Sequence, residues 1–456
     1  MTEKNVQSRS LFDLDGKPGI KRGLPIALQH LLAMLIGNVL PSIVLAGNIN
    51  AIPELAITAE ESVYIIQAGM FIAAIATFLQ LYPVLKVGAR LPVIMGVSFA
   101  YIPVLISIGT KYGIGAVYGA QLVGGIVAFI VGIGIGKIRH LFPPMVSGTV
   151  VITIGLGLYT VALNYMAGGV GDPTYGDPKN WAIAVLTLVV VLICNMYAKG
   201  YLKLAAILVG IIVGYVVSIP LGMVDFNSIG EASWLTYPHI MPFKLQFPTD
   251  AVITMVIMYI VNSVQAVGDI TSTTVGGLDR EPTDEELSGG IKCNGVASVL
   301  GALIGGLPTA TFSQNVGIVA FTKVVSLQVF KMTAIMIAIA GFIPKFGAIM
   351  LSVPKAVIGG ATISVFAQIT MGGMKLITSD EMSVRNTTIV GLGIALGMGI
   401  TQIPKEAVAQ FPDWFNMIFT SSPVILATIV VFFLNLILPK KSIAEEQAER
   451  DQIDKA

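Results

Sequence analysis

Long apolar stretches recur along almost the whole chain and are separated by short polar or charged turns. A membrane-spanning helix needs about 20 predominantly apolar residues. We therefore predict an all-α integral membrane protein with about fourteen spans. Their expected positions are residues 25–46, 63–82, 91–109, 114–135, 143–166, 181–198, 201–222, 250–270, 289–307, 309–325, 330–350, 354–374, 386–403 and 422–438. Stretches near 91–135 and 289–325 are short or broken by Gly and Pro, so the count carries a margin of one or two.

Lys and Arg residues are divided unevenly between alternate loops. If both termini are cytoplasmic, 21 of the 27 cationic residues lie on the cytoplasmic side, from Lys4 and Arg9 to Lys455. Cationic residues gather on that side of membrane proteins. The asymmetry predicts an even number of spans, cytoplasmic tails at 1–23 and 439–456, and a multi-pass protein of the cell membrane.

Composition excludes several other classes of protein. Hydrophobic residues make up 55% of the chain and charged residues only 12%, whereas a soluble domain carries about 25% charged residues. A net charge of +1 provides no basic surface for nucleic acid. Three His and two Cys offer little for a metal or haem enzyme. We expect no enzyme activity, no catalytic residues, no resident metal or cofactor and no nucleic-acid partner.

Two of the predicted spans are interrupted by polar residues at bilayer depth. One interruption runs over 92–103 and the other over 308–317, and each begins at a proline. Irregular backbone at that depth is tolerated where it is buried in protein or lines a cavity, and paired interruptions in two halves mark transporter sites. They lie seven spans apart, and an odd offset inverts the topology. We predict two inverted seven-span repeats with a site where the breaks meet; two kinked helices without a cavity are the alternative.

Polar side chains within other spans extend the candidate site. Nearly every carboxylate lies in a tail or a loop, and Asp269 is the exception because it lies inside a predicted span. Gln265 lies four residues earlier on the same helical face. Asp269 alternatively caps a half-helix or accepts hydrogen bonds from Thr271 and Ser272. His30 in the first span either bridges two helices through hydrogen bonds or relays protons.

The interruptions themselves offer groups that match a flat polar ligand. Gln314 and Asn315 combine hydrogen-bond donors and acceptors, which suits the edge of a planar heterocycle. Phe99 and Phe312 flank the breaks and can stack on such a ring. As the alternative, either ring packs in the core or faces lipid. Asn294 is a further amide within the ninth span.

These residues resemble the nucleobase–ascorbate transporter family, also called nucleobase:cation symporter-2. The family signature is Gln, Glu or Pro, then Asn-x-Gly, four free residues, Thr, and Arg, Lys or Gly. Residues 314–323 resemble it through Gln314, Asn315, Gly317, Thr322 and Lys323. In addition, 29–30 resembles the Gln-His pair of the family's first span, and 267–271 is similar to its eighth-span motif.

The resemblance implies a core domain of residues 24–135 and 250–350 and a gate domain of residues 136–249 and 351–438. It implies short strands in spans 3 and 10, a homodimer, and secondary active transport of purine bases such as xanthine or uric acid by an elevator motion. The residues implied to bind substrate are Ser98, Phe99, Gln265, Phe312, Ser313 and Gln314. Those implied to support the site or couple it to an ion are His30, Asp269, Asn294 and Asn315.

Two positions depart from the family pattern and leave the energy source open. The family usually has Glu where this chain has Gln265, and its purine permeases tend to have Asp where this chain has Asn294. Asp269 then carries a coupling proton, or coordinates Na⁺ with nearby oxygens, or the protein is an uncoupled uniporter. A small-anion transporter of the same fold and a membrane enzyme or receptor are the remaining alternatives.

Overall fold

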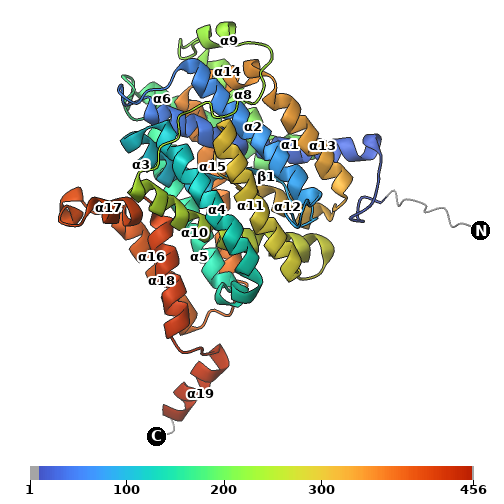
Figure 1. Cartoon of the computed structure of the whole chain (residues 1–456), viewed down its shortest axis with the longest axis vertical. Coiled ribbons are helices and arrows are strands. Elements are labelled where there is room, and N and C mark those ends of the chain that lie inside the picture. The colour runs from blue at the N-terminus through green and yellow to red at the C-terminus, as the bar shows by residue number, and fades with distance from the viewer. Residues whose placement is uncertain (1–9, 454–456) are drawn as a thin grey trace, which may run out of the picture.

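The computed structural model describes residues 10–453, which fold almost entirely into helices (Figure 1). Lys4, Arg9 and Lys455, which contributed to the charge asymmetry, lie outside this range. The first half contains α1 (Ile20–Ile49), α2 (Ala59–Leu81), β1 (Met95–Val97), η1 (Phe99–Tyr101), α3 (Ile102–Tyr112), α4 (Ile114–Ile138), η2 (Arg139–Leu141), α5 (Pro144–Met166), α6 (Pro178–Tyr197), α7 (Tyr201–Leu204), α8 (Ala206–Ser218) and α9 (Asn227–Glu231). The second contains α10 (Thr249–Leu278), α11 (Asp284–Ile304), β2 (Thr309–Thr311), α12 (Ser313–Thr322), α13 (Leu327–Gly341), α14 (Pro344–Ser352), α15 (Lys355–Ile377), α16 (Val384–Ile400), η3 (Lys405–Val408), α17 (Asp413–Phe419), α18 (Pro423–Ile437) and α19 (Ile443–Ile453).

Many of the described helices are long and apolar enough to cross a membrane. There are eight of them, or ten if α13–α14 and α17–α18, which are bent by 79° and 80°, each count as one span. The predicted multi-pass helical membrane protein is thereby confirmed, whereas the count of fourteen stays a prediction. The stretch expected to span at 330–350 contains this first bend, because α13 ends at Gly341 and α14 begins at Pro344, which has no N–H to continue the helix.

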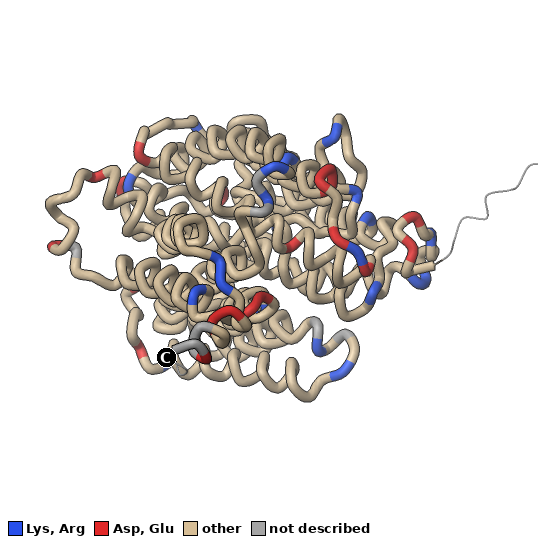
Figure 2. The backbone as a smooth tube through the Cα atoms, turned by 90° about the horizontal axis from the view of Figure 1, so that it is seen from below, with Lys and Arg blue, Asp and Glu red and all other residues tan. Residues whose placement is uncertain are grey.

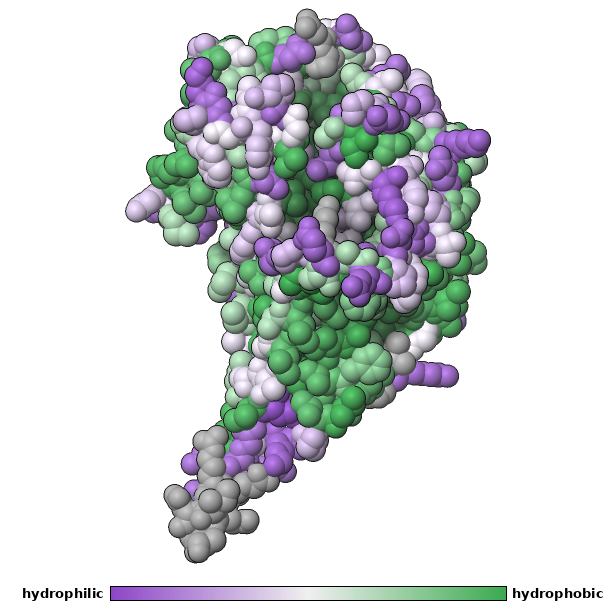
Figure 3. Space-filling model, turned by 90° about the vertical axis from the view of Figure 1, so that its left-hand side faces the viewer, coloured by the Kyte–Doolittle hydropathy of each residue, from purple (hydrophilic) through white to green (hydrophobic). Residues whose placement is uncertain are grey.

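The molecular surface agrees with residence in a bilayer. Charged residues lie mainly on loops and helix ends, whereas most of the helical backbone carries uncharged residues (Figure 2). A broad apolar area covers part of the face shown in Figure 3. A patch of that extent is expected where lipid, rather than water, contacts the protein.

The helices pack in two sets. In the first, α4 packs against α10 and α11, and α13 packs against α1 and α2; in the second, α15 packs against α5 and α6, and α18 against α5 and α16. Small residues permit these close approaches, as is usual between membrane helices. A Cβ atom added to Gly360 of α15 would lie 2.1 Å from the Ala184 carbonyl oxygen of α6.

Replacing Gly360 by Ala is expected to destabilise the protein by about 1–3 kcal/mol, because the new methyl group overlaps rigid backbone. Gly391→Ala is the matched control, since an added Cβ there meets nothing within 4 Å. Both changes gain the same helix propensity, about 1 kcal/mol. Thermal unfolding of the two purified variants in detergent measures the difference, and equal melting temperatures would contradict the α6–α15 contact.

Both broken spans contain a short strand, and the two strands pair in the interior. β1 and β2 are antiparallel, with Gly96 opposite Ala310, which confirms the expected strands in the two interruptions. Backbone groups far from water must be hydrogen-bonded. Asn38 Oδ1 therefore accepts from Val97 N at 2.7 Å, Thr77 Oγ1 accepts from the Met95 amide at 3.1 Å, and Ser298 Oγ accepts from Thr309 N at 3.2 Å.

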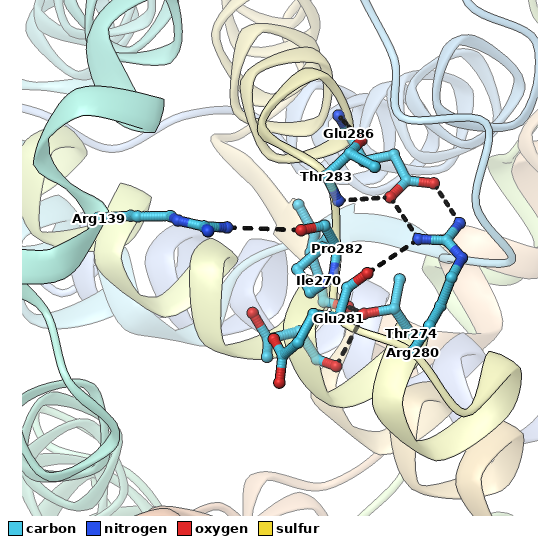
Figure 4. A network of polar contacts seen from close by, with 9 residues as sticks. Arg139, Ile270, Thr274, Arg280, Glu281, Pro282, Thr283 and Glu286 are labelled. Atoms are coloured by element: carbon cyan, nitrogen blue, oxygen red, sulfur yellow. Dashed lines mark hydrogen bonds and ion pairs between the residues drawn. The ribbon is translucent and has the colours of Figure 1, made fainter.

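A polar network closes the turn between α10 and α11 (Figure 4). The Arg280 guanidinium donates to both Glu286 carboxylate oxygens at 2.5 and 2.8 Å, and this contact raises the pKa of Arg280. Glu286 also accepts from Thr283 N at 2.8 Å and completes a capping box at the start of α11. Arg139 donates to the Pro282 carbonyl oxygen at 3.4 Å. The turn thus fixes α11 relative to α10, which carries part of the candidate site.

Candidate functional site

The two interruptions meet in one small cleft, which we call the central cleft. It is lined by Val97, Ser98, Phe99, Ala100, Ile154, Gln265, Thr311, Phe312, Ser313, Gln314 and Ile369. All six residues expected to bind substrate are in this lining. Ile154 and Ile369 come from α5 and α15, so both sets of helices contribute to the cleft. The alternative of two kinked helices without a cavity is therefore wrong.

Two short helices begin at the cleft. Ser98 is the N-cap of η1, and its Oγ accepts from Ala100 N at 3.2 Å. Phe312 is the N-cap of α12 and has no side-chain acceptor for the helix. The first N–H groups of a helix have no partner within it. This end of α12 can therefore donate backbone hydrogen bonds to a ligand in the cleft.

Asp269 on α10 is the centre of a hydrogen-bond network that joins α10 to the second interruption. Its Oδ2 accepts from Thr311 Oγ1 at 2.5 Å, and its Oδ1 accepts from Ser313 Oγ at 2.8 Å. Gln265 Nε2 donates to Ser313 Oγ at 3.5 Å, and Gln265 Oε1 accepts from Asn262 Nδ2 at 3.1 Å. The carboxylate is buried and accepts from two hydroxyl groups, with no described ion-pair partner.

The local roles considered for Asp269 are not what the structure shows. α10 is continuous from Thr249 to Leu278, so Asp269 caps no half-helix. Its carboxylate bonds to Thr311 and Ser313 rather than to Thr271 and Ser272. The physical reason is that β2 and the start of α12 each bring a hydroxyl group beside the buried carboxylate, where any unmade hydrogen bond would be costly.

The Phe312 ring is fixed by two glycines. A Cβ atom on Gly96 would lie 2.6 Å from its Cε2, and one on Gly37 would lie 2.8 Å from its Cε1. Both approaches are possible only because these positions have no side chain. Phe99 packs edge-on against Phe366 of α15, with ring centroids 5.3 Å apart. Both rings are therefore ordered by the protein and line the cleft, rather than facing lipid.

His30 and Asn315 lie behind the cleft and connect α1 with α12. Asn315 Nδ2 contacts His30 Nδ1 at 3.0 Å and the His30 carbonyl oxygen at 3.1 Å. Because the amide nitrogen is a donor, the imidazole accepts at Nδ1 and carries its hydrogen on Nε2. Both residues are buried, and neither lines the cleft. This arrangement is the expected helix bridge.

Replacing His30 by Leu is expected to lower stability by about 1–3 kcal/mol, since a buried Asn315 donor loses an acceptor. Unfolding of His30→Leu, Asn315→Leu and the double variant forms a double-mutant cycle. The double variant should cost less than the sum of the single changes. Strictly additive effects would show that the two side chains do not stabilise each other.

Asn294 is a further predicted site residue that does not line the cleft. It is buried in α11, and both its amide atoms lack a partner among the described residues. Conversely, sequence reasoning did not select Thr311, Ile154 or Ile369. Thr311 falls within the second interruption, and that position was a usable signal. The two isoleucines are ordinary residues of apolar helices, and nothing in the sequence distinguishes them.

Comparison with known proteins identifies the family. The model described as "Permease family" matches residues 22–406. The chain is 31% identical over 429 residues to the xanthine permease of Bacillus subtilis, covering 92% of this chain and 94% of that protein. It is 34% identical over 381 residues to the uric acid permease PucK of the same organism, covering 83% and 87%. The chain belongs to the nucleobase–ascorbate transporter family. This permease is a membrane transporter and not an enzyme.

Solved structures support the fold of this permease. The transmembrane domain of the cyanobacterial bicarbonate transporter BicA matches with a TM-score of 0.54 and 14% identity, over 90% of this chain and 97% of that one. Murine solute carrier 26 family member A9, an anion transporter in an inward-facing state, matches with a TM-score of 0.59 and 12% identity, over 91% and 68%. At these identities the likeness establishes the architecture alone.

Proposed function

We propose that this permease is a secondary active transporter of purine nucleobases such as xanthine or uric acid. The observation that carries the proposal is the central cleft, where amide groups of Gln265 and Gln314 lie with two ordered phenyl rings. Rings bind the faces of a planar base, and amides match the mixed donors and acceptors on its edge. The relatives named as xanthine and uric acid permeases support the same substrate class.

A small anion is a poorer match to this cleft. The described lining residues include no Lys or Arg, and Asp269, which is hydrogen-bonded to Thr311 and Ser313 of the lining, would repel a negative charge when ionised. Helix N-termini attract anions, but the two aromatic rings would add nothing for a compact hydrated ion. The fold shared with bicarbonate and other anion transporters therefore does not decide the substrate.

For the mechanism, we propose alternating access by an elevator motion. A core domain of residues 24–135 and 250–350 carries most of the cleft and moves against a gate domain of residues 136–249 and 351–438. The lining supports this proposal, because Ile154 and Ile369 of the proposed gate domain line the same cleft as residues of the proposed core domain. We also propose a homodimer, in line with the family resemblance.

We propose cation symport through Asp269, with H⁺ or Na⁺ as the coupling ion. The carboxylate lies beside the cleft and shares Ser313 with Gln265. Ion binding at Asp269 would therefore change the hydroxyl group that contacts the substrate-binding amide. This connection is a physical route by which occupancy of one site alters affinity at the other.

Uptake of radiolabelled xanthine into proteoliposomes, with imposed pH or Na⁺ gradients, tests the proposal. We expect uptake driven by one gradient and competed by selected purines but not by sulfate or bicarbonate. Uptake without a gradient requirement would identify a uniporter. Absence of both uptake and binding of any base, with sulfate or bicarbonate transported instead, would overturn the nucleobase assignment.

A further inference from the structure

A second and larger cleft lies at the end of the molecule where α2 begins. Its volume is about 430 Å³, and it is bounded by the first turns of α2, the segment that follows α9, and the start of α14. Lys345 holds the α9 side in place, because its Nζ donates to the Ile229 and Gly230 carbonyl oxygens at 2.6 and 3.0 Å. We call this space the α2–α14 cleft. It shares no lining residue with the central cleft.

Gln67 lines the α2–α14 cleft with a buried amide group that the described contacts leave partly unsatisfied. Its side chain lines the cleft although the residue is only 1% exposed, and Nε2 has no hydrogen-bond partner within the described part of the chain. A buried donor without a partner costs about 1–3 kcal/mol. Gln67 also lies seven residues after Glu60, which places it about 10 Å deeper along the helix. The inner part of the cleft therefore offers a hydrogen-bond donor that the protein leaves unused.

The mouth of the cleft offers hydrogen-bond acceptors rather than donors. Glu60 and Glu231 line it and have no described hydrogen-bond or ion-pair partner, whereas the Glu61 carboxylate is used by the capping box of α2. The described lining residues include no Lys or Arg. Carboxylates are acceptors only. The mouth thus favours a ligand that presents N–H donors and disfavours phosphate and other anions.

An aromatic surface lies between these two polar regions. The His239 imidazole stacks on the Tyr64 ring with centroids 4.9 Å apart and an interplanar angle of 15°. Tyr64 Oη is occupied, since it donates to the Ile304 carbonyl oxygen at 2.8 Å and accepts from His239 N at 2.6 Å. His239 is exposed, so one face of its ring can extend the stack onto a ligand. A flat ring is the matching shape.

We propose that the α2–α14 cleft is a second base-binding site, which takes a planar heterocycle of the guanine type. On guanine, the N1–H and 2-amino groups lie side by side and can donate together to one carboxylate at the mouth. The O6 and N7 acceptors are next to that edge and can accept from Gln67. A dioxopurine lacks the 2-amino group and places a carbonyl oxygen there, which a carboxylate would repel.

Binding of radiolabelled guanine to the purified full-length protein tests this site. The protein carries Gln314→Ala, so that the central cleft does not contribute. We expect saturable binding near one guanine per chain, which excess unlabelled xanthine displaces poorly. Gln67→Leu and Glu231→Gln should each weaken binding by about tenfold, the loss expected for one hydrogen bond to a charged or buried partner.

Two control variants keep the result interpretable. Gln80→Leu changes another buried, unpartnered glutamine of α2 that lies outside the cleft, and Glu54→Gln changes a carboxylate outside it. Both should leave guanine affinity unchanged, and a cooperative thermal unfolding transition should show that every variant folds.

Three outcomes would overturn the proposal. The first is that the Gln314→Ala protein does not bind guanine, and the second is that Gln67→Leu leaves guanine binding intact. The third is that the protein co-purifies with phosphatidylethanolamine and that Gln67→Leu removes this lipid rather than bound guanine. The last would identify a lipid-headgroup site. Because binding is measured with the central cleft disabled, failure of xanthine uptake in the unmodified protein would not affect this test.

Discussion

Replacing Gln314 by Ala is expected to abolish xanthine uptake while the protein remains folded in the membrane. Gln314 lines the central cleft at the first turn of α12, and its amide has no hydrogen-bond partner among the described residues. Truncation therefore breaks no hydrogen bond that the structure describes. A substrate that loses two amide hydrogen bonds, each worth about 1–1.5 kcal/mol, binds roughly a hundredfold more weakly.

Initial uptake rates in proteoliposomes measure this effect at substrate concentrations near the unmodified protein's half-saturation. Gln402→Ala is the matched control, because Gln402 is exposed on the loop after α16 and lies outside the cleft. It should transport normally. Normal uptake by the Gln314→Ala protein would remove Gln314 from the site, and a large fall in melting temperature would indicate a structural role instead.

Replacing Asp269 by Asn is expected to eliminate gradient-driven accumulation of substrate. The change keeps the shape of the side chain but removes its capacity to bind H⁺ or to pair with Na⁺. The hydroxyl groups of Thr311 and Ser313 can rotate, since each is both donor and acceptor, so the network should persist with an amide at its centre. Xanthine binding should therefore stay within about tenfold of normal.

Accumulation under imposed pH and Na⁺ gradients, measured alongside equilibrium binding, separates the two effects. Asp250→Asn is the control on the same helix, because Asp250 accepts from Lys111 and Tyr112 at the beginning of α10, away from the cleft. Full gradient-driven accumulation by the Asp269→Asn protein would exclude Asp269 as the coupling group. Loss of binding together with transport would assign it to substrate recognition.

The sequence predicted the helical membrane architecture and the position of the cleft because both have local signals. Apolar runs mark helices by length, and the prolines at 92 and 308, each at the start of a span interrupted by polar residues, mark the strands. The bend between α13 and α14 was missed because Ile343, Pro344 and their neighbours keep the stretch apolar on average. Mean hydropathy carries no information about the direction of the helix axis, so it cannot reveal a bend.

The connections within the site were beyond sequence reasoning. Asp269 bonds to residues 42 and 44 positions away, and no local pattern selects them over Thr271 and Ser272. Threonines within membrane helices commonly bond to their own backbone, as Thr273 does to the Asp269 carbonyl oxygen. Only the structure, in which β1 pairs with β2, shows that Thr311 donates to the Asp269 side chain rather than to its own backbone.

The glycines around Phe312 set limits on how this permease can be redesigned. The ring is wedged between the backbones of α1 and β1, so it cannot swing aside to admit a bulkier solute. Enlarging the cleft from that side would require moving whole segments that are hydrogen-bonded along their edges. Ile154 and Ile369 face no such constraint, and trimming either to Val or Ala removes methyl groups without disturbing the strands. Selection for variants that accept substituted purines should therefore yield changes at these two isoleucines and leave Phe312 untouched.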